Sequence, residues 1–214
     1  MTRIFLRPIP LALLLLFLSA IPIGAALLRM VQIPTGTLPQ DAIKFVVVPV
    51  VLFGHALAGA LFGVLGPIQF AGVLKRRFGR FHRITGRVFV AAGVLLALSS
   101  LRLLWQFPDA STFVLVTARL VAGFGLAAAL VIAFVAIRQH QVARHKAWMI
   151  RAYAIGMGSA TVSFLMLPIF IISGEPVEGY AADLVFVASW AINIGIAEWV
   201  IRRPLARAGA AVAA

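Results

Sequence analysis

Long apolar runs alternate with short polar stretches along the whole chain. A helix needs about 20 mostly apolar residues to cross the hydrocarbon core of a bilayer. Six segments meet this requirement, at residues 8–30, 43–68, 84–105, 112–137, 148–173 and 182–201. Because the connections are short, neighbouring helices must run antiparallel. The pattern predicts an all-α protein, a six-helix transmembrane bundle that forms one domain over residues 1–207, with a frayed tail at 208–214.

The first apolar run has some features of a signal peptide. Two arginines precede it, and Gly24-Ala25-Ala26 resembles a cleavage site. The apolar stretch nevertheless continues through Leu27 and Leu28, which makes it longer than a typical signal-peptide core. We therefore expect a retained helix. Cleavage would leave the topology of the remaining spans unchanged.

Composition also indicates a membrane protein. Of the 214 residues, 63% are hydrophobic and 12% are charged, which leaves too few polar side chains to cover a water-soluble surface. A net charge of +13 can indicate nucleic-acid binding, but here the cations lie in short stretches beside apolar runs. That arrangement is typical of topology signals and of contact with anionic lipids. We expect the lipid bilayer as a partner and no nucleic acid. The absence of cysteine excludes disulfides and thiolate metal sites.

Charge is segregated between the two sides of the six-span arrangement. Fifteen of the 19 cations fall on one side and five of the six acids on the other. The two densest basic stretches are residues 75–87 and 138–151. Since loops rich in lysine and arginine stay in the cytoplasm, the pattern predicts cytoplasmic amino and carboxy termini. The expected location is a bacterial inner membrane, crossed several times.

Two histidines lie at the same predicted depth, each in one of these basic stretches. The residues after His82 and His145 echo one another, which suggests a duplicated helix pair. Two histidines on different helices at one depth could be the axial ligands of a b-type haem iron, with Arg87 and Arg151 pairing with the haem propionates. The alternative is that both histidines bind lipid phosphate or cap a helix.

His55 is a third candidate ligand. It lies 12 residues into the second predicted helix, or about 18 Å at 1.5 Å per residue, and thus near the middle of the membrane. An ionisable side chain at that depth suggests a function. Gly59, Gly63 and Gly66 share its helix face. This strip could accommodate a flat cofactor such as haem with His55 as ligand, or it could pack against a neighbouring helix.

Two further polar side chains fall inside predicted spans. Arg119 lies about a third of the way along its helix and needs a partner, which could be a backbone carbonyl, Asp109, Asp183 or an anionic ligand. Glu198 is expected to pair with Arg202 at i+4.

Several motifs in order along the chain resemble one family of bacterial membrane proteins, domain of unknown function 2306. The likeness covers residues 48–203 and is carried by His55, Leu65 to Phe70, His82-Arg83, Gly86-Arg87, His145, Trp148-Met149, Arg151 to Tyr153, Asn193 and Ala197 to Arg203. The resemblance implies a polytopic membrane protein and transfers no catalytic residue. A looser likeness to cytochrome b561 and ferric-reductase haem bundles rests on membrane histidines among small residues, and fold alone does not imply function.

Three functions fit these features. The leading hypothesis is haem b- or quinone-linked electron transfer, in which the protein serves as a membrane oxidoreductase subunit that works with quinone or a redox partner protein. The second is a transporter of small molecules or lipids, with Arg119 and His55 lining a polar cavity. The third is a non-catalytic role in assembly or partner binding, in which small-residue strips act as docking surfaces and a homo-oligomer can form.

Overall fold

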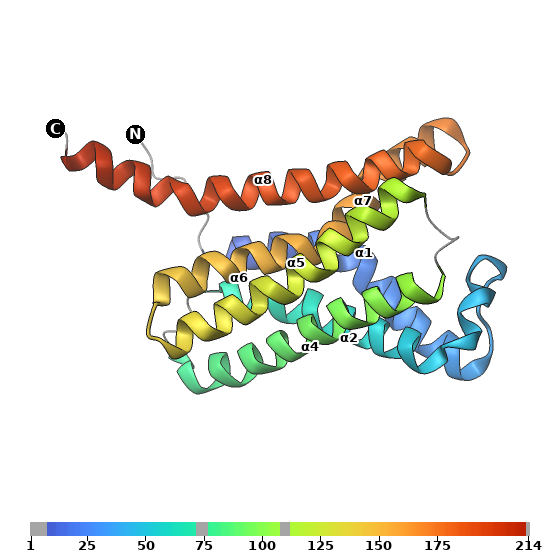
Figure 1. The fold of residues 1–214 in the computed structure, drawn as a ribbon, viewed down its shortest axis with the longest axis horizontal. Coiled ribbons are helices and arrows are strands. Elements are labelled where there is room, and N and C mark those ends of the chain that lie inside the picture. Colours follow the sequence, from blue (N-terminus) through green and yellow to red (C-terminus); the bar gives the residue numbers. More distant parts are fainter. Residues whose placement is uncertain (1–7, 72–76, 108–111, 213–214) are drawn as a thin grey trace. The chain divides into compact units, whose positions relative to one another are not determined.

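The computed structural model describes residues 8–71, 77–107 and 112–212, which are helical apart from the connections between helices (Figure 1). No strand occurs within these residues, which confirms the all-α prediction. Five helices are long and apolar enough to cross a membrane, and a bent helix pair adds a sixth when it is counted as one span. The prediction of a polytopic helical membrane protein is therefore confirmed, with five to six candidate spans.

The chain forms two compact units, residues 1–106 and 107–214. In the first unit α2 packs against both α1 and α4. These helices have the bounds Pro8–Thr35 for α1, Pro49–Phe70 for α2 and Gly79–Gln106 for α4. The prediction from the sequence was one domain over residues 1–207. Whether the two units form one domain stays a prediction.

Helix α2 begins later than the apolar pattern predicts. Residues Gln40–Val47 form a 3-10 helix, η1, and the α-helix begins only at Pro49. Proline favours the first helical position because its fixed φ suits the helix and it has no N–H to satisfy. The apolar run that starts at residue 43 is thus divided between two elements.

The second unit contains α5 (Phe113–Arg138), α6 (Val142–Gly156), α7 (Gly158–Ser173) and α8 (Gly179–Val212). Helix α5 packs against α6, and α8 contacts α5, α6 and α7. The span predicted at 148–173 is broken at Met157, where α6 and α7 meet with a bend of 41°. Helix α8 extends to Val212, in keeping with the high helix propensity of alanine, and fraying of the tail at 208–214 stays a prediction.

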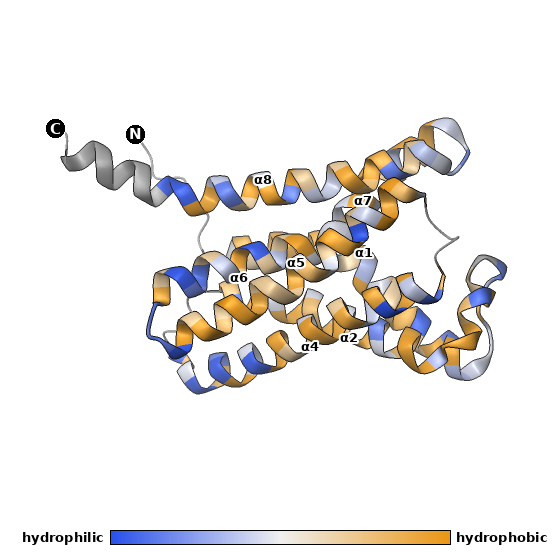
Figure 2. Cartoon of the chain, viewed as in Figure 1, coloured by the Kyte–Doolittle hydropathy of each residue, from blue (hydrophilic) through white to orange (hydrophobic). Residues whose placement is uncertain are grey.

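The long helices are built mainly of hydrophobic residues (Figure 2), and many of their large apolar side chains are exposed. Trp105 and Phe113 are each 84% exposed, and Ile172 is 87% exposed. Such a surface would be unfavourable in water but suits contact with acyl chains. Hydrophilic residues gather instead at helix ends, including the start of α4 and the turn between α5 and α6. The helices therefore contact the lipid bilayer.

Candidate functional site

His82 and His145 occupy equivalent positions in the two units. Each is the fourth residue of a helix, α4 and α6 respectively, and each of these helices packs against the helix that precedes it in the same unit. In both cases Nδ1 lies about 3 Å from a polar group of that preceding helix. This equivalence agrees with the duplicated helix pair that the sequence suggested.

The ring of His145 is held by a backbone carbonyl. Its Nδ1 lies 2.9 Å from the carbonyl oxygen of Ala133 in α5. A carbonyl oxygen can only accept, so Nδ1 must carry the hydrogen, and the lone pair of the neutral ring lies on Nε2. Histidines that bind metals commonly donate their other N–H in this way, which fixes both tautomer and ring orientation. His145 thus has the chemistry of an iron ligand through Nε2.

His82 has a different partner, the side-chain amide of Gln69 at the penultimate position of α2. The polar contacts are satisfied when the amide nitrogen donates to His82 Nδ1 at 3.0 Å and to the His82 carbonyl oxygen at 3.3 Å. The amide oxygen then accepts from the Gly86 N–H at 3.2 Å. Since Nδ1 accepts, the hydrogen of the neutral His82 ring lies on Nε2.

His55 lies closer to the first residue of its helix, α2, than predicted. Because α2 begins at Pro49, His55 is only about 9 Å along it, not about 18 Å. Its Nδ1 is 3.0 Å from Ser99 Oγ of α4, and the Ser99 hydroxyl donates to the Leu95 carbonyl at 2.7 Å. The serine oxygen therefore accepts from His55 Nδ1–H.

The glycine strip beside His55 is a helix-packing surface. A Cβ on Gly63 would lie 2.9 Å from Ile23 Cγ1 of α1, and the Ser19 hydroxyl donates to the Gly63 carbonyl at 3.3 Å. At Gly59 the nearest neighbour would be Leu96 Cδ1 of α4, at 3.8 Å. Neighbouring helices therefore cover the face that might have accommodated a flat cofactor, and the packing alternative explains this part of the strip.

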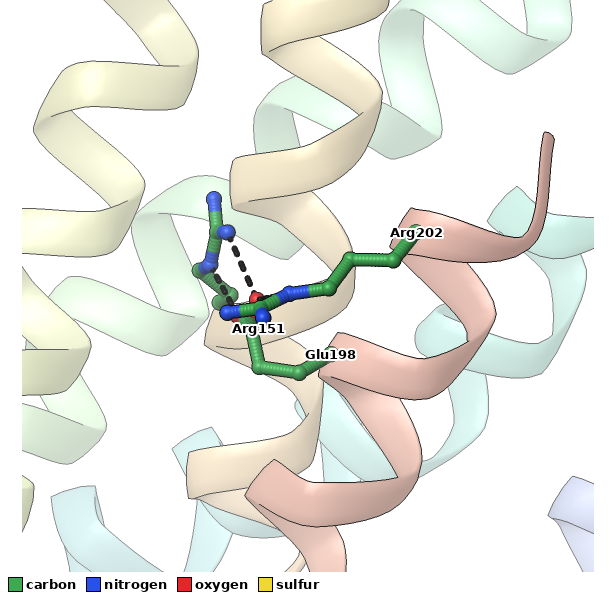
Figure 3. A network of polar contacts seen from close by, with 3 residues as sticks. All are labelled: Arg151, Glu198 and Arg202. Carbon is green, nitrogen blue, oxygen red and sulfur yellow. Dashed lines mark hydrogen bonds and ion pairs between the residues drawn. The ribbon is translucent and has the colours of Figure 1, made fainter. Parts of the chain in front are cut away.

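Glu198 lies between two arginines (Figure 3). Arg151 of α6 forms a fork with its carboxylate, from Nε to Oε1 at 2.6 Å and from Nη2 to Oε2 at 3.1 Å. The expected i+4 pair is also present, with Arg202 Nε 3.4 Å from Oε2. The Arg151 partner comes from another helix and was not predicted from the sequence. Two of the guanidinium donors of Arg151 are thus already bonded to Glu198 and are not available to a propionate.

Arg119 lies in α5, and the residue that caps this helix bonds to a buried carboxylate of α8. Asp183 of α8 is 4% exposed and accepts a hydrogen bond from Thr112, the residue that caps α5. The guanidinium carbon of Arg119 lies 5.5 Å from the centre of the Phe186 ring of α8. The partner of Arg119 among those proposed from the sequence stays a prediction. Asp109 lies outside the described residues.

Side chains of α8 stabilise the break between α6 and α7. Trp190 Nε1 donates to the Ile155 carbonyl at 3.1 Å, and Asn193 Nδ2 donates to the Ala154 carbonyl at 3.1 Å. Thr161 in turn donates to Asn193 Oδ1 at 2.8 Å. Carbonyls in a last helical turn lack intrahelical partners, and leaving them unsatisfied in lipid is costly. This network therefore explains how a broken helix is tolerated at this point.

These features define a polytopic α-helical membrane protein with histidines and ion pairs near helix ends. In the parts of the chain that the structure describes, no group of three or more histidine, aspartate or glutamate side chains is arranged to hold a metal ion. Residues 52–201 match the family described as predicted membrane protein (DUF2306), and the chain belongs to this family. No curated protein and no solved structure matches the chain.

Proposed function

We propose that the protein binds a b-type haem and takes part in electron transfer, with His145 as an axial ligand. The supporting observation is the 2.9 Å bond from His145 Nδ1–H to the Ala133 carbonyl, which makes Nε2 the lone-pair atom of the ring. When bound, haem would supply one-electron chemistry. The protein would hold the iron through His145 and tune its potential through the bond to Ala133.

His82 is a second candidate ligand. It occupies the equivalent position in its own unit, and its candidacy rests on the chemistry of its own ring. Ligation through Nε2 requires the hydrogen to move to Nδ1, which in turn requires the amide oxygen of Gln69 to face that atom.

Charged groups at the same helix starts suit haem propionates. Arg87 is exposed on α4, five residues beyond His82, and a guanidinium matches a carboxylate in geometry. Arg151, which lies in the same unit as His145, would have to release Glu198 first. Electron exchange with membrane quinone or with a redox partner protein would complete the function.

Absorption spectroscopy of the purified protein, expressed with ample haem, tests the proposal. We expect a Soret band that is lost or strongly reduced in His145→Ala. The matched control is His140→Ala, because His140 is an exposed histidine in the turn just before α6. An unmutated protein without a Soret band, or an equal loss in the His140 variant, refutes the proposal.

Transport of a small anionic molecule is a second candidate. The observation that favours it is the broken α6–α7 helix in the same unit as Arg119, since discontinuous helices often form substrate sites in transporters. It ranks second because Trp190 and Asn193 already satisfy the carbonyls at the break. In this hypothesis Arg119→Leu abolishes uptake by proteoliposomes while the protein still folds. Unchanged uptake contradicts it.

A further inference from the structure

We propose that Gln69 is a positioning residue that sets the tautomer of His82 and thereby decides whether Nε2 of that ring can bind iron. The consequence for iron rests on the proposed function. The tautomer itself is a property of this hydrogen-bonded cluster and can be measured without haem. The two parts of the inference can therefore fail separately.

The hydrogen-bond network favours one orientation of the Gln69 amide. With the nitrogen toward His82, the amide makes three complementary contacts, with His82 Nδ1, the His82 carbonyl and the Gly86 N–H. The Thr85 hydroxyl donates to the Phe81 carbonyl at 2.8 Å, so its oxygen is complementary to the amide nitrogen in the reverse orientation, at 2.7 Å. In the reverse orientation the amide oxygen would face the His82 carbonyl oxygen at 3.3 Å, and the amide nitrogen would face the Gly86 N–H at 3.2 Å. Both of these contacts are repulsive, so the network assigns the nitrogen to the His82 side.

Gly86 makes room for this contact. A Cβ at position 86 would lie 3.1 Å from the nearest terminal atom of the Gln69 amide, which is tighter than ordinary van der Waals contact. Gly86 lies one turn beyond His82 on the same face of α4. The amide can thus reach across from α2 and lie against the α4 backbone beside the ring.

The two equivalent histidines therefore differ in their partners. Ala133 presents a backbone carbonyl that can only accept, so His145 keeps its lone pair on Nε2 permanently. Gln69 presents an amide that can donate or accept, and it donates in the favoured orientation. For His82 to present the Nε2 lone pair, the amide must turn over and accept the two repulsive contacts. We infer that the Nε2 lone pair is a fixed feature of the neutral His145 ring and an exchangeable feature of the neutral His82 ring.

Nitrogen NMR of the full chain with ¹⁵N-labelled histidine tests this inference. Protonated and unprotonated ring nitrogens resonate in well-separated ranges, and spectra of variants with single histidines removed assign the signals. Under mildly alkaline conditions, where the rings are neutral, we expect hydrogen on Nδ1 of His145 and on Nε2 of His82. Gln69→Glu replaces the amide by a carboxylate that only accepts. It should move the hydrogen of His82 to Nδ1.

The control is Gln139→Glu, the same substitution at an exposed glutamine in the turn before α6. It should leave the His82 signals unchanged. Hydrogen on Nδ1 of His82 in the unmutated protein overturns the inference, whether or not the Gln69 variant folds. An unchanged His82 tautomer in a folded Gln69→Glu protein overturns it as well. A missing Soret band refutes the proposed function and leaves the tautomer result standing.

Discussion

Replacing Gly158 by alanine perturbs the break between α6 and α7 at its tightest point. A Cβ at this position would collide with Trp190 Nε1 and would lie 2.5 Å from Cδ1 and 2.9 Å from Cε2 of the same ring. The indole is rigid, so it must move as a whole. Moving it breaks the 3.1 Å bond from Trp190 Nε1 to the Ile155 carbonyl.

The expected cost follows from these contacts. A buried carbonyl left without its donor costs about 1–3 kcal/mol. Forcing an extra methyl group into a packed site costs about 1–3 kcal/mol more. Alanine gains at most about 1 kcal/mol over glycine in helix propensity, and less near a helix start. The Gly158→Ala variant should therefore lose about 2–4 kcal/mol in free energy of unfolding.

Reversible unfolding in mixed detergent micelles measures this loss. The control is Gly195→Ala in the interior of α8, where the added Cβ meets no neighbouring side chain or helix within 4 Å, and it should gain up to about 1 kcal/mol from helix propensity. In a Trp190→Leu background the alanine at 158 should cost far less, because the colliding ring is gone. Equal stability of the Gly158 and Gly195 variants refutes the reasoning.

Two further pairs of variants test the polar contacts by the same unfolding assay. Ser99→Ala removes the acceptor of His55 and should cost about 0.5–1.5 kcal/mol, more than Ala at the neighbouring Ser100, whose hydroxyl bonds only within its own helix. Arg151→Gln should cost about 1.5–3 kcal/mol, because it removes a charged fork from a side chain that is 26% exposed. Arg202→Gln, at 76% exposure on the same carboxylate (Figure 3), should cost no more than about 1 kcal/mol. Equal costs within either pair contradict the assignment.

The sequence predicts the helices well because the bilayer constrains them directly. A span must be apolar over a fixed length, and the apolar runs near α1, α4 and α5 correspond to single helices. Hydropathy does not report where backbone geometry changes inside an apolar run. The start of α2 at Pro49 and the break at Met157 both lie within such runs. Both differences between the predicted and the observed helices come from local backbone geometry.

The sequence also identifies most of the polar side chains that matter but few of their partners. Depth along a helix singles out His82, His145 and Glu198. Their partners come from other helices, and for His145 the partner is a backbone carbonyl, which leaves no trace in residue type. The pair of Glu198 with Arg202 could be predicted because i+4 spacing is local. The fork with Arg151 depends on how α6 packs against α8.

The break between α6 and α7 also determines the number of membrane crossings. If the pair returned to the side where it began, the loop at 174–178 with its two glutamates would share a side with the basic stretches. Arg202 and Arg203 would then lie on the opposite side, against the usual bias of cationic residues. A returning pair needs a reversal of direction, whereas the observed bend is 41°. Because the two helices therefore continue in the same general direction, we expect α6 and α7 to form one span, which gives six crossings in total.

Six crossings would place both ends of the chain on one side, and the positive-inside bias predicts that this side is the cytoplasm. Reporter domains that are active in only one compartment, fused after residue 141, within 174–178 and after residue 214, measure this directly. We expect the first and third fusions to report from the cytoplasm and the second from the opposite side. A fusion within 174–178 in the same compartment as the one after residue 141 would show that the bent pair does not cross. In that case Arg202 and Arg203 would lie on the side opposite the cytoplasm. The orientation inferred from the distribution of cationic residues would then be wrong.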